Sequence, residues 1–216
     1  MNLTEILIKH QSDKGPMPPE GHNYGPFYEK YFEPIRNEPL RILEIGIGGE
    51  NVPNSGGNSL RAWKEYFPNA KIFGIDIHDK SHVNEDRIYT YKGSQIDQKF
   101  LMDLELRGPF DIIIDDGSHM SSHQIKSFQL LFEYALKPGG FYFVEDLSCS
   151  YRWDFEGCKK YSDIHSQDNA VNYFLDFVID LMRPEIGLNE YRPSEYRKFI
   201  EHIDFGSEIM LIKKKI

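Results

Sequence analysis

Short apolar runs alternate along the chain with segments whose apolar residues recur at helical spacing. Four of these runs, at residues 40–45, 70–77, 111–114 and 141–144, consist mainly of apolar residues, many of them isoleucine or phenylalanine. Such short runs are typical of strands that are buried on both faces, as in a parallel sheet. The alternation of strand and helix therefore predicts an α/β fold with a doubly wound sheet.

The remaining segments complete this prediction. Helices are expected over residues 1–10, 27–36, 121–136 and 169–182, with a further short strand over 87–91 and a closing hairpin over 199–212. Asn58 or Ser59 is expected to cap another helix. The Lys-Pro-Gly-Gly sequence at 137–140 is expected to stop the helix over 121–136. Residues 1–36 are predicted to form N-terminal helices with a candidate lid, and residues 147–166 a substrate-facing insertion.

Composition narrows the class of protein. The 216 residues carry a formal net charge of −9, with 40% hydrophobic and 14% aromatic residues. These values suit one packed domain over residues 1–216 and disfavour a nucleic-acid or anionic-membrane partner. No segment resembles a signal peptide or reaches the length of a membrane span, so no membrane insertion is expected. Cys149 and Cys158 are expected to be free thiols in a reducing cytoplasm. The sequence leaves open whether the protein forms a homo-oligomer.

Two of the predicted strands end in paired carboxylates. Asp115 and Asp116 close one strand, and Glu145 and Asp146 close the next. In a sheet of order 3-2-1-4-5 these strands are neighbours roughly 4.8 Å apart, so their acids are expected to converge. Like charges so close require a cation, and oxygen ligands without cysteine favour a hard ion such as Mg²⁺. The alternative is that each acid caps a helix or pairs with a Lys or Arg side chain.

His119 follows the first acidic pair and is the candidate general base. An imidazole, whose ordinary pKa is about 6.5, can accept a proton near neutral pH. Together, metal and base are expected to activate one hydroxyl of a vicinal diol. His123, one helical turn further on, either orients His119 or faces solvent.

A glycine turn and an acidic strand end predict a ligand pocket. Gly46 and Gly48 follow the first strand, where residues without a side chain let the backbone approach a ligand closely. The spacing is not a dinucleotide fingerprint, because Asn51 stands where the third glycine would fall. Asp76 ends the second strand and is placed to bind ribose hydroxyls.

These stretches resemble a known family. Residues 43–49 (Leu-Glu-Ile-Gly-Ile-Gly-Gly) resemble motif I of class I S-adenosylmethionine-dependent methyltransferases. An ordered set of segments is more specific: Ser-Asp-Lys at 12–14, Gly-Asn-Ser-Leu-Arg-Ala-Trp at 57–63, Gly-Ile-Asp at 74–76, Asp-Asp-Gly-Ser-His at 115–119, and Glu-Asp-Leu at 145–147 followed by Ser150 and Tyr151. It is similar to the metal-dependent sugar O-methyltransferases of macrolide antibiotic and surface-glycan biosynthesis, over about residues 12–151.

The resemblance implies a fold, a reaction and a site. The fold is a seven-stranded, mostly parallel Rossmann-like sheet of order 3-2-1-4-5-7-6 with a C-terminal antiparallel hairpin. The reaction is in-line transfer of the S-adenosylmethionine methyl group to a hydroxyl of a sugar, glycosylated natural product or surface glycan, with Mg²⁺ as second cofactor. The implied metal ligands are Asp116, Glu145 and Asp146, with His119 and Asp116 catalytic. The implied cofactor-binding residues are Glu44, Gly46, Gly48, Ser59, Asp76, Ile77, Gln95 and Asp115.

The sequence differs from the family pattern in two places, and other functions are possible on the same fold. Many relatives carry Gly-Asp-Gln where this chain has Gly93-Ser94-Gln95. The larger macrolide enzymes also have an N-terminal auxiliary domain, which is not expected here, so their substrate and assembly state do not transfer. The acceptor could instead be a phenol or catechol, a carboxylate or a phosphoramidate, or the protein could be a non-catalytic nucleotide-binding protein. His119 argues against the last, because an inactive site needs no base. The candidates for lid or sugar contacts are Asp13, Lys14, His22, Tyr24, Tyr28 and Tyr151.

Overall fold

The centre of the molecule is a seven-stranded sheet. The structure, a computed structural model, describes residues 1–16, 21–105, 108–152, 168–182 and 193–216. The strand order β3-β2-β1-β4-β5-β7-β6 is the predicted order. The first five strands pair in parallel, and β7 is antiparallel to both β5 and β6. The strands are β1 (Arg41–Ile45), β2 (Lys71–Asp76), β3 (Ile88–Lys92), β4 (Phe110–Asp115), β5 (Leu136–Val144), β6 (Ile200–Phe205) and β7 (Met210–Lys214).

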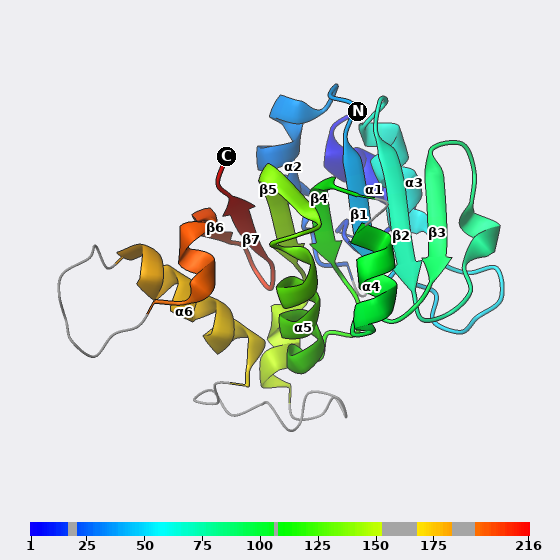
Figure 1. The fold of residues 1–216 in the computed structure, drawn as a ribbon. Helices are drawn as coiled ribbons and strands as arrows, with labels where there is room; N and C mark the ends of the chain where they lie inside the picture. Colours follow the sequence, from blue (N-terminus) through cyan, green and yellow to red (C-terminus); the bar gives the residue numbers. More distant parts are fainter. Residues whose placement is uncertain (17–20, 106–107, 153–167, 183–192) are drawn as a thin grey trace.

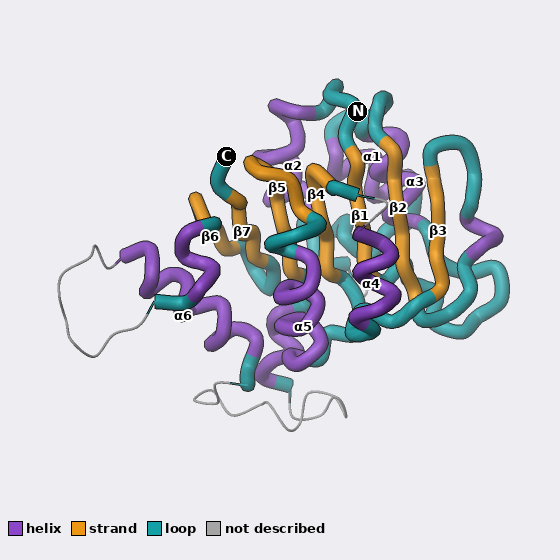
Figure 2. Tube along the Cα trace, in the orientation of Figure 1, coloured by secondary structure: helices purple, strands orange, loops and turns teal. Residues whose placement is uncertain are grey.

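Helices cover both faces of the sheet (Figure 1). One layer contains α1 (Leu3–Lys9), α2 (Gly25–Phe32) and α3 (Asn58–Tyr66), and the other contains α4 (Gln98–Glu105), α5 (Ser121–Leu131) and α6 (Ala170–Met182). Short 3₁₀ segments are η1 (Glu33–Ile35), η2 (Ser81–Val83), η3 (Leu147–Tyr151) and η5 (Glu195–Lys198). Figure 2 shows the same three layers as purple helices before and behind the orange strands.

The apolar runs are continuous because successive side chains of each central strand enter different layers. Ile112 and Ile114 of β4 belong to the apolar cluster beneath α1–α3, whereas Ile113 between them belongs to the cluster beneath α4–α6. All three side chains are fully buried. Since burial of one such side chain stabilises the fold by about 1.5–3 kcal/mol, both layers contribute strongly to stability.

The end of α5 differs from its prediction. The helix ends at Leu131 instead of Leu136, and the Lys-Pro-Gly-Gly segment is part of β5. Leu136 pairs with Phe110 of β4, and the register shifts before Ile112. Gly139 takes up the irregularity with a φ of 76°. Pairing of β5 with β4 therefore places the Lys-Pro-Gly-Gly sequence inside a strand, where it does not end a helix.

The start of α3 also differs. Gly57, with a φ of 79°, precedes the helix, and no side chain caps its first turn. The Asn58 amide donates to Gln11 O at 3.0 Å, and the Ser59 hydroxyl donates to Glu44. Both side chains are thus committed to tertiary contacts, so the predicted cap is wrong.

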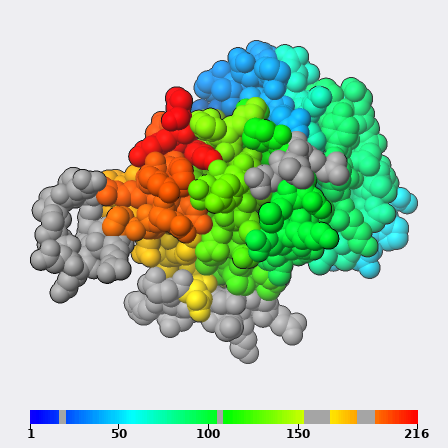
Figure 3. All heavy atoms as spheres, in the orientation of Figure 1, coloured from blue at the N-terminus to red at the C-terminus, as the bar shows by residue number. Residues whose placement is uncertain are grey.

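N- and C-terminal parts of the chain lie side by side, since Lys30 of α2 forms an ion pair with Asp204 of β6 at 2.5 Å. Figure 3 shows red C-terminal residues next to blue N-terminal ones, with green residues in the centre. Among the described residues, no helix combines the length and apolar character needed to cross a membrane. Cys149 is buried, while Cys158 and most of the predicted insertion, residues 153–166, lie outside the described residues.

Candidate functional site

The site lies where the sheet order reverses, at the carboxyl ends of β1 and β4. The Asp116 amide donates to Ile45 O at 2.9 Å, which brings the two strand ends together. Gly46 has a φ of 76°, and a Cβ atom there would lie 2.1 Å from Asp116 O. Only glycine allows this close approach, and it places the Asp116 side chain beside the glycine turn.

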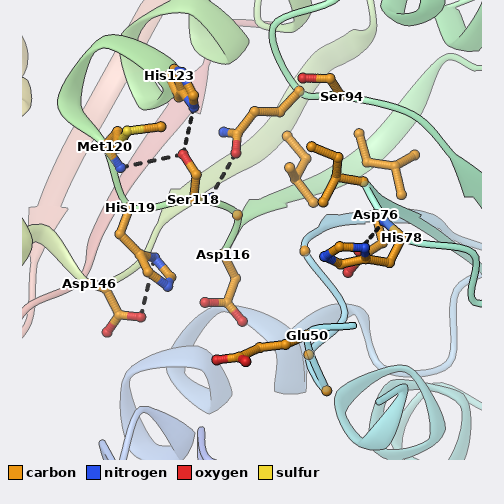
Figure 4. Close-up of a pocket in the computed structure, with 18 of the residues that line it drawn as sticks. Glu50, Asp76, His78, Ser94, Asp116, Ser118, His119, Met120, His123 and Asp146 are labelled. Atoms are coloured by element: carbon orange, nitrogen blue, oxygen red, sulfur yellow. Dashed lines mark hydrogen bonds and ion pairs between the residues drawn. The ribbon is translucent and has the colours of Figure 1, made fainter. Parts of the chain in front are cut away.

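A cavity of about 420 Å³ opens beside this junction. Its volume falls within the range of about 300–1,000 Å³ that is usual for small-molecule sites. Five of the predicted cofactor-binding residues line it: Gly46, Gly48, Asp76, Ile77 and Gln95. The same wall includes six residues that the sequence analysis did not assign to the cofactor: Glu50, His78, Ser94, Ser118, Met120 and His123 (Figure 4).

A smaller cavity of about 180 Å³ adjoins the first one. Both are lined by Asp13, Gly48, Gly49 and Asp116, and the smaller one also contacts Ser59. An ideal Cβ atom on Gly48 would have no neighbour within 4 Å, so this glycine leaves open space where the cavities meet. The pair of cavities therefore suits an extended ligand with a bulky and a narrow part.

Backbone contacts fix Asp76 at the end of β2. Its carboxylate accepts hydrogen bonds from the amides of His78 at 2.8 Å and Ile47 at 3.2 Å. The side chain thereby joins the first two strand ends at the wall of the larger cavity. This is the position in which the sequence predicts contacts to ribose hydroxyls.

Glu44 and Asp115, by contrast, lie beneath the site. Both are fully buried, and neither lines the larger or the smaller of these two cavities. Glu44 accepts hydrogen bonds from the Ser59 hydroxyl and the Trp63 indole, and burial raises its pKa to about 7. Burial likewise raises the pKa of Asp115 to about 6. Both carboxylates accept hydrogen bonds from side chains around the cavities, Ser59 in the case of Glu44 and Gln95 in the case of Asp115, and so position these groups.

Gln95 connects the buried Asp115 with the Ser118 segment at the cavity wall. Its side-chain amide donates to Asp115 Oδ1 at 3.1 Å, and its Oε1 accepts from the Ser118 amide at 2.8 Å. A Cβ atom on Gly117 would lie 2.2 Å from Gln95 Oε1, so a larger residue there would displace the Gln95 side chain. The bridge holds the segment that carries His119.

Three of the side chains that line the larger cavity converge on one another. Asp116, His119 and Asp146 each present a ligand atom, and these atoms all lie within 4.8 Å of one another. His119 Nδ1 is 3.5 Å from Asp146 Oδ2, and Figure 4 shows the imidazole between the two carboxylates. Two carboxylates fit a hard divalent cation, which prefers oxygen ligands, and the adjacent imidazole fits a proton acceptor.

Glu145, the third predicted ligand, faces a different group. Its Oε2 lies 2.7 Å from Lys14 Nζ, and its Oε1 accepts a hydrogen bond from the Tyr28 hydroxyl. Burial lowers the pKa of Lys14, but the carboxylates of Asp116, Glu145 and Glu44 outweigh burial and raise it well above its usual value. The ammonium is therefore charged and forms ion pairs within the site.

The N-terminal segment reaches the same carboxylates. The Tyr24 hydroxyl donates to Asp146 Oδ1 at 2.8 Å, and His22 stacks on Tyr24 with ring centroids 5.0 Å apart. His22 Nδ1 also lies 3.3 Å from Glu208, a residue between β6 and β7 that no sequence pattern singles out. Tyr151 lines a separate cavity of about 240 Å³ together with Glu208.

Known proteins share this sequence and fold. The 8-demethyl-8-alpha-L-rhamnosyl tetracenomycin-C 2'-O-methyltransferase of Streptomyces olivaceus is 44% identical over 215 residues, which cover 99% of this chain and 54% of that protein. The chain is a homologue of sugar O-methyltransferases. The demethylmacrocin O-methyltransferase of Streptomyces fradiae is 50% identical to it over 137 residues, 63% of this chain and 34% of that protein.

A solved structure supports the same relationship. MycE methyltransferase from the mycinamycin biosynthetic pathway, in complex with Mg, SAH and mycinamycin VI, matches with a TM-score of 0.87 and 33% identity. The match covers 100% of this chain and 55% of MycE. The seven-stranded fold is therefore that of a class I methyltransferase. No protein-family profile matches the chain, and the chain spans about half or less of the length of these curated relatives.

Proposed function

We propose that this chain catalyses transfer of the methyl group of S-adenosylmethionine to a sugar hydroxyl of a glycosylated small molecule, in a reaction that depends on Mg²⁺. The observation that carries the proposal is the convergence of Asp116, His119 and Asp146 beside a cavity of cofactor size. The similarity to sugar O-methyltransferases supports the reaction class.

The larger cavity fits the methyl donor. Asp76 lies at the strand end where a ribose binds in folds of this kind, and Gly46 and Gly48 leave room for close approach of the ligand to the backbone. The smaller cavity, beside Ser59 and Asp13, fits the amino-acid part of the donor. Its reactive methyl group would then face Asp116, which both cavities share.

Asp116 and Asp146 are the residues that would hold Mg²⁺, and Glu145 would join them if Lys14 and Tyr28 released it. Mg²⁺ is present in the related MycE structure, and when bound here it would supply a Lewis acid that lowers the pKa of an acceptor hydroxyl. His119 accepts the hydroxyl proton on an imidazole nitrogen, next to Asp146. The remaining catalytic effect comes from alignment of the two reactants.

The acceptor side is formed by Tyr24, His22 and the neighbouring Glu208. Hydroxyl, imidazole and carboxylate groups bind sugar hydroxyls through hydrogen bonds, which supports a sugar over an apolar phenol. The formal charge of −9 agrees with a neutral small-molecule acceptor rather than a nucleic acid. Location in the cytoplasm and assembly into a homo-oligomer stay predictions.

Calorimetric titration tests the site directly. We expect the metal-free protein to bind S-adenosylmethionine and then Mg²⁺, and the variant Asp116→Ala to bind the donor but lose the metal. The variant His119→Ala should bind both, yet transfer methyl groups about 10²–10⁴-fold more slowly, as loss of a general base predicts. Failure of the wild-type protein to bind the donor would overturn the methyltransferase proposal.

The acceptor class needs its own measurement. Mass spectrometry after incubation with the donor, Mg²⁺ and either a rhamnosylated polyketide or a simple catechol separates the two classes. We expect methylation of the glycoside at one of two vicinal hydroxyls. Methylation of the catechol alone would keep the enzyme class but overturn the sugar assignment.

A further inference from the structure

Lys14 is a buried cation inside the carboxylate cluster. Its Nζ atom contacts Asp116 and lies 2.7 Å from Glu145 Oε2 and 3.7 Å from Glu44 Oε1. Only 1% of the lysine side chain is exposed. One ammonium group therefore faces three carboxylates where bulk water does not screen their charges.

The oxygens that Lys14 contacts are those that a metal would need. The ammonium donates to Asp116 Oδ2 and to Glu145 Oε2, and the other Glu145 oxygen already accepts from the Tyr28 hydroxyl. Both oxygens of Glu145 thus have a buried donor. An ammonium and a divalent cation repel each other, so they exclude each other from a position between the same two carboxylates.

We propose that Lys14 is a positioning residue that acts as the internal counter-ion of the metal site and is displaced when Mg²⁺ binds. In the metal-free protein its ammonium keeps Asp116 and Glu145 together despite their like charges. The inference rests on the proposed metal-dependent function and gives a role to a residue that this function does not use. It means that the affinity for Mg²⁺ is reduced by competition within the same chain.

The backbone connects Lys14 to the acceptor side of the site. Lys14 O accepts a hydrogen bond from the Tyr24 amide at 2.8 Å, and Asp13 O accepts one from the His22 amide at 2.8 Å. The side chains of Tyr24 and His22 in turn contact Asp146. Displacement of the Lys14 ammonium consequently loosens the segment that places these two side chains beside the acceptor.

Metal titration of matched variants tests the competition. In calorimetry of the metal-free full chain with Mg²⁺, we expect Lys14→Met to bind at least about tenfold more tightly than wild type, because a repelling charge is gone. Lys214→Met is the control: Lys214 is also buried, but its Nζ donates to the carbonyl oxygens of Phe132, Glu133 and Leu136. The control should bind Mg²⁺ as wild type does. Unchanged or weaker binding by Lys14→Met would overturn the inference.

A measurement on the unmodified protein covers the case in which Lys14→Met does not fold. Amide hydrogen exchange of wild type should become faster over residues 12–16 and 22–24 when Mg²⁺ is added, and slower or unchanged exchange would contradict displacement. If neither wild type nor Lys14→Met binds Mg²⁺, the metal site of the proposed function fails and the inference fails with it. Metal binding that the lysine substitution leaves unchanged overturns the inference alone.

Discussion

At the scale of single residues, the site depends on buried charges whose partners come from distant parts of the chain. Asp115 is fully buried at the end of β4. Its carboxyl oxygens accept hydrogen bonds from the Gln95 amide, the Ser127 hydroxyl and, at 3.5 Å, the Tyr142 hydroxyl. These neutral donors do not compensate for burial, which raises the pKa of Asp115 from 3.8 to about 6.

This raised pKa predicts a pH dependence of stability. The folded protein binds the proton of Asp115 more tightly than the unfolded chain does, so its contribution is fully present below pH 3.8 and is lost as the pH rises through about 6. Two pKa units correspond to about 3 kcal/mol. In urea unfolding from about pH 4 to about pH 7, the stability advantage of wild type over Asp115→Asn should shrink by up to that amount. Parallel pH profiles of the two proteins would contradict this assignment.

At the scale of elements, the strands and the carboxylate pairs were predictable because the signals are local. The apolar runs of β1, β2, β4 and β5 are each followed by glycine or acid, and parallel strands bring those ends to one edge of the sheet. The end of α5 was not predictable, because it depends on the pairing of Leu136 with Phe110 across a register shift.

The position of the N-terminal loop was also beyond local signals. Lys14 lies 102 positions from Asp116 and 131 from Glu145 in the sequence, and only tertiary packing brings its ammonium between them. The contact of His22 with Glu208 has the same origin. The sequence pattern therefore predicted that these acids converge and offered pairing with a Lys or Arg side chain as the alternative to a metal. The structure shows that pairing for Asp116 and Glu145, but no local signal identified Lys14 as the partner.

The glycine turn after β1 gives a prediction at this scale, with a control in the same turn. Gly46 and Gly48 have φ values of 76° and 70°, so alanine at either position costs about 1–2 kcal/mol of strain. Only at Gly46 would the new Cβ atom also collide, 2.1 Å from Asp116 O. We expect Gly46→Ala to lose about 3 kcal/mol or more and Gly48→Ala only the strain. Thermal unfolding measures the difference.

Gly48→Ala, the more stable of the two variants, should nevertheless bind the methyl donor poorly. The Cβ atom of Gly48→Ala enters the space between the two cavities, where no protein atom lies within 4 Å. Calorimetry with S-adenosylmethionine should therefore show weaker binding for Gly48→Ala even though it folds well. In the thermal unfolding experiment, an equal loss of stability in Gly46→Ala and Gly48→Ala would show that the contact with Asp116 O does not destabilise the fold.

At the scale of the whole molecule, the sheet separates two apolar layers that have different tasks. The layer of α1–α3 contains the aromatic side chains Tyr28 and Phe32, and Tyr28 donates a hydrogen bond to Glu145 in the site. The layer of α4–α6 is centred on Phe128, which packs against Phe174, Phe177 and Tyr196. Figure 1 shows these helices on opposite faces of the strands.

This separation predicts that substitutions in the two layers are energetically independent. Phe32 contacts Trp63 and Phe143, whereas Phe128 contacts Tyr142, the neighbour of Phe143 that points to the other face. Phe32→Leu and Phe128→Leu should each lower the free energy of unfolding by on the order of 1–2 kcal/mol, and the double variant by the sum within about 0.5 kcal/mol. Urea unfolding of the three variants gives the coupling energy. A coupling above about 1 kcal/mol would mean that β5 transmits strain between the layers, so that packing behind α5 would also shift the acids at the strand ends.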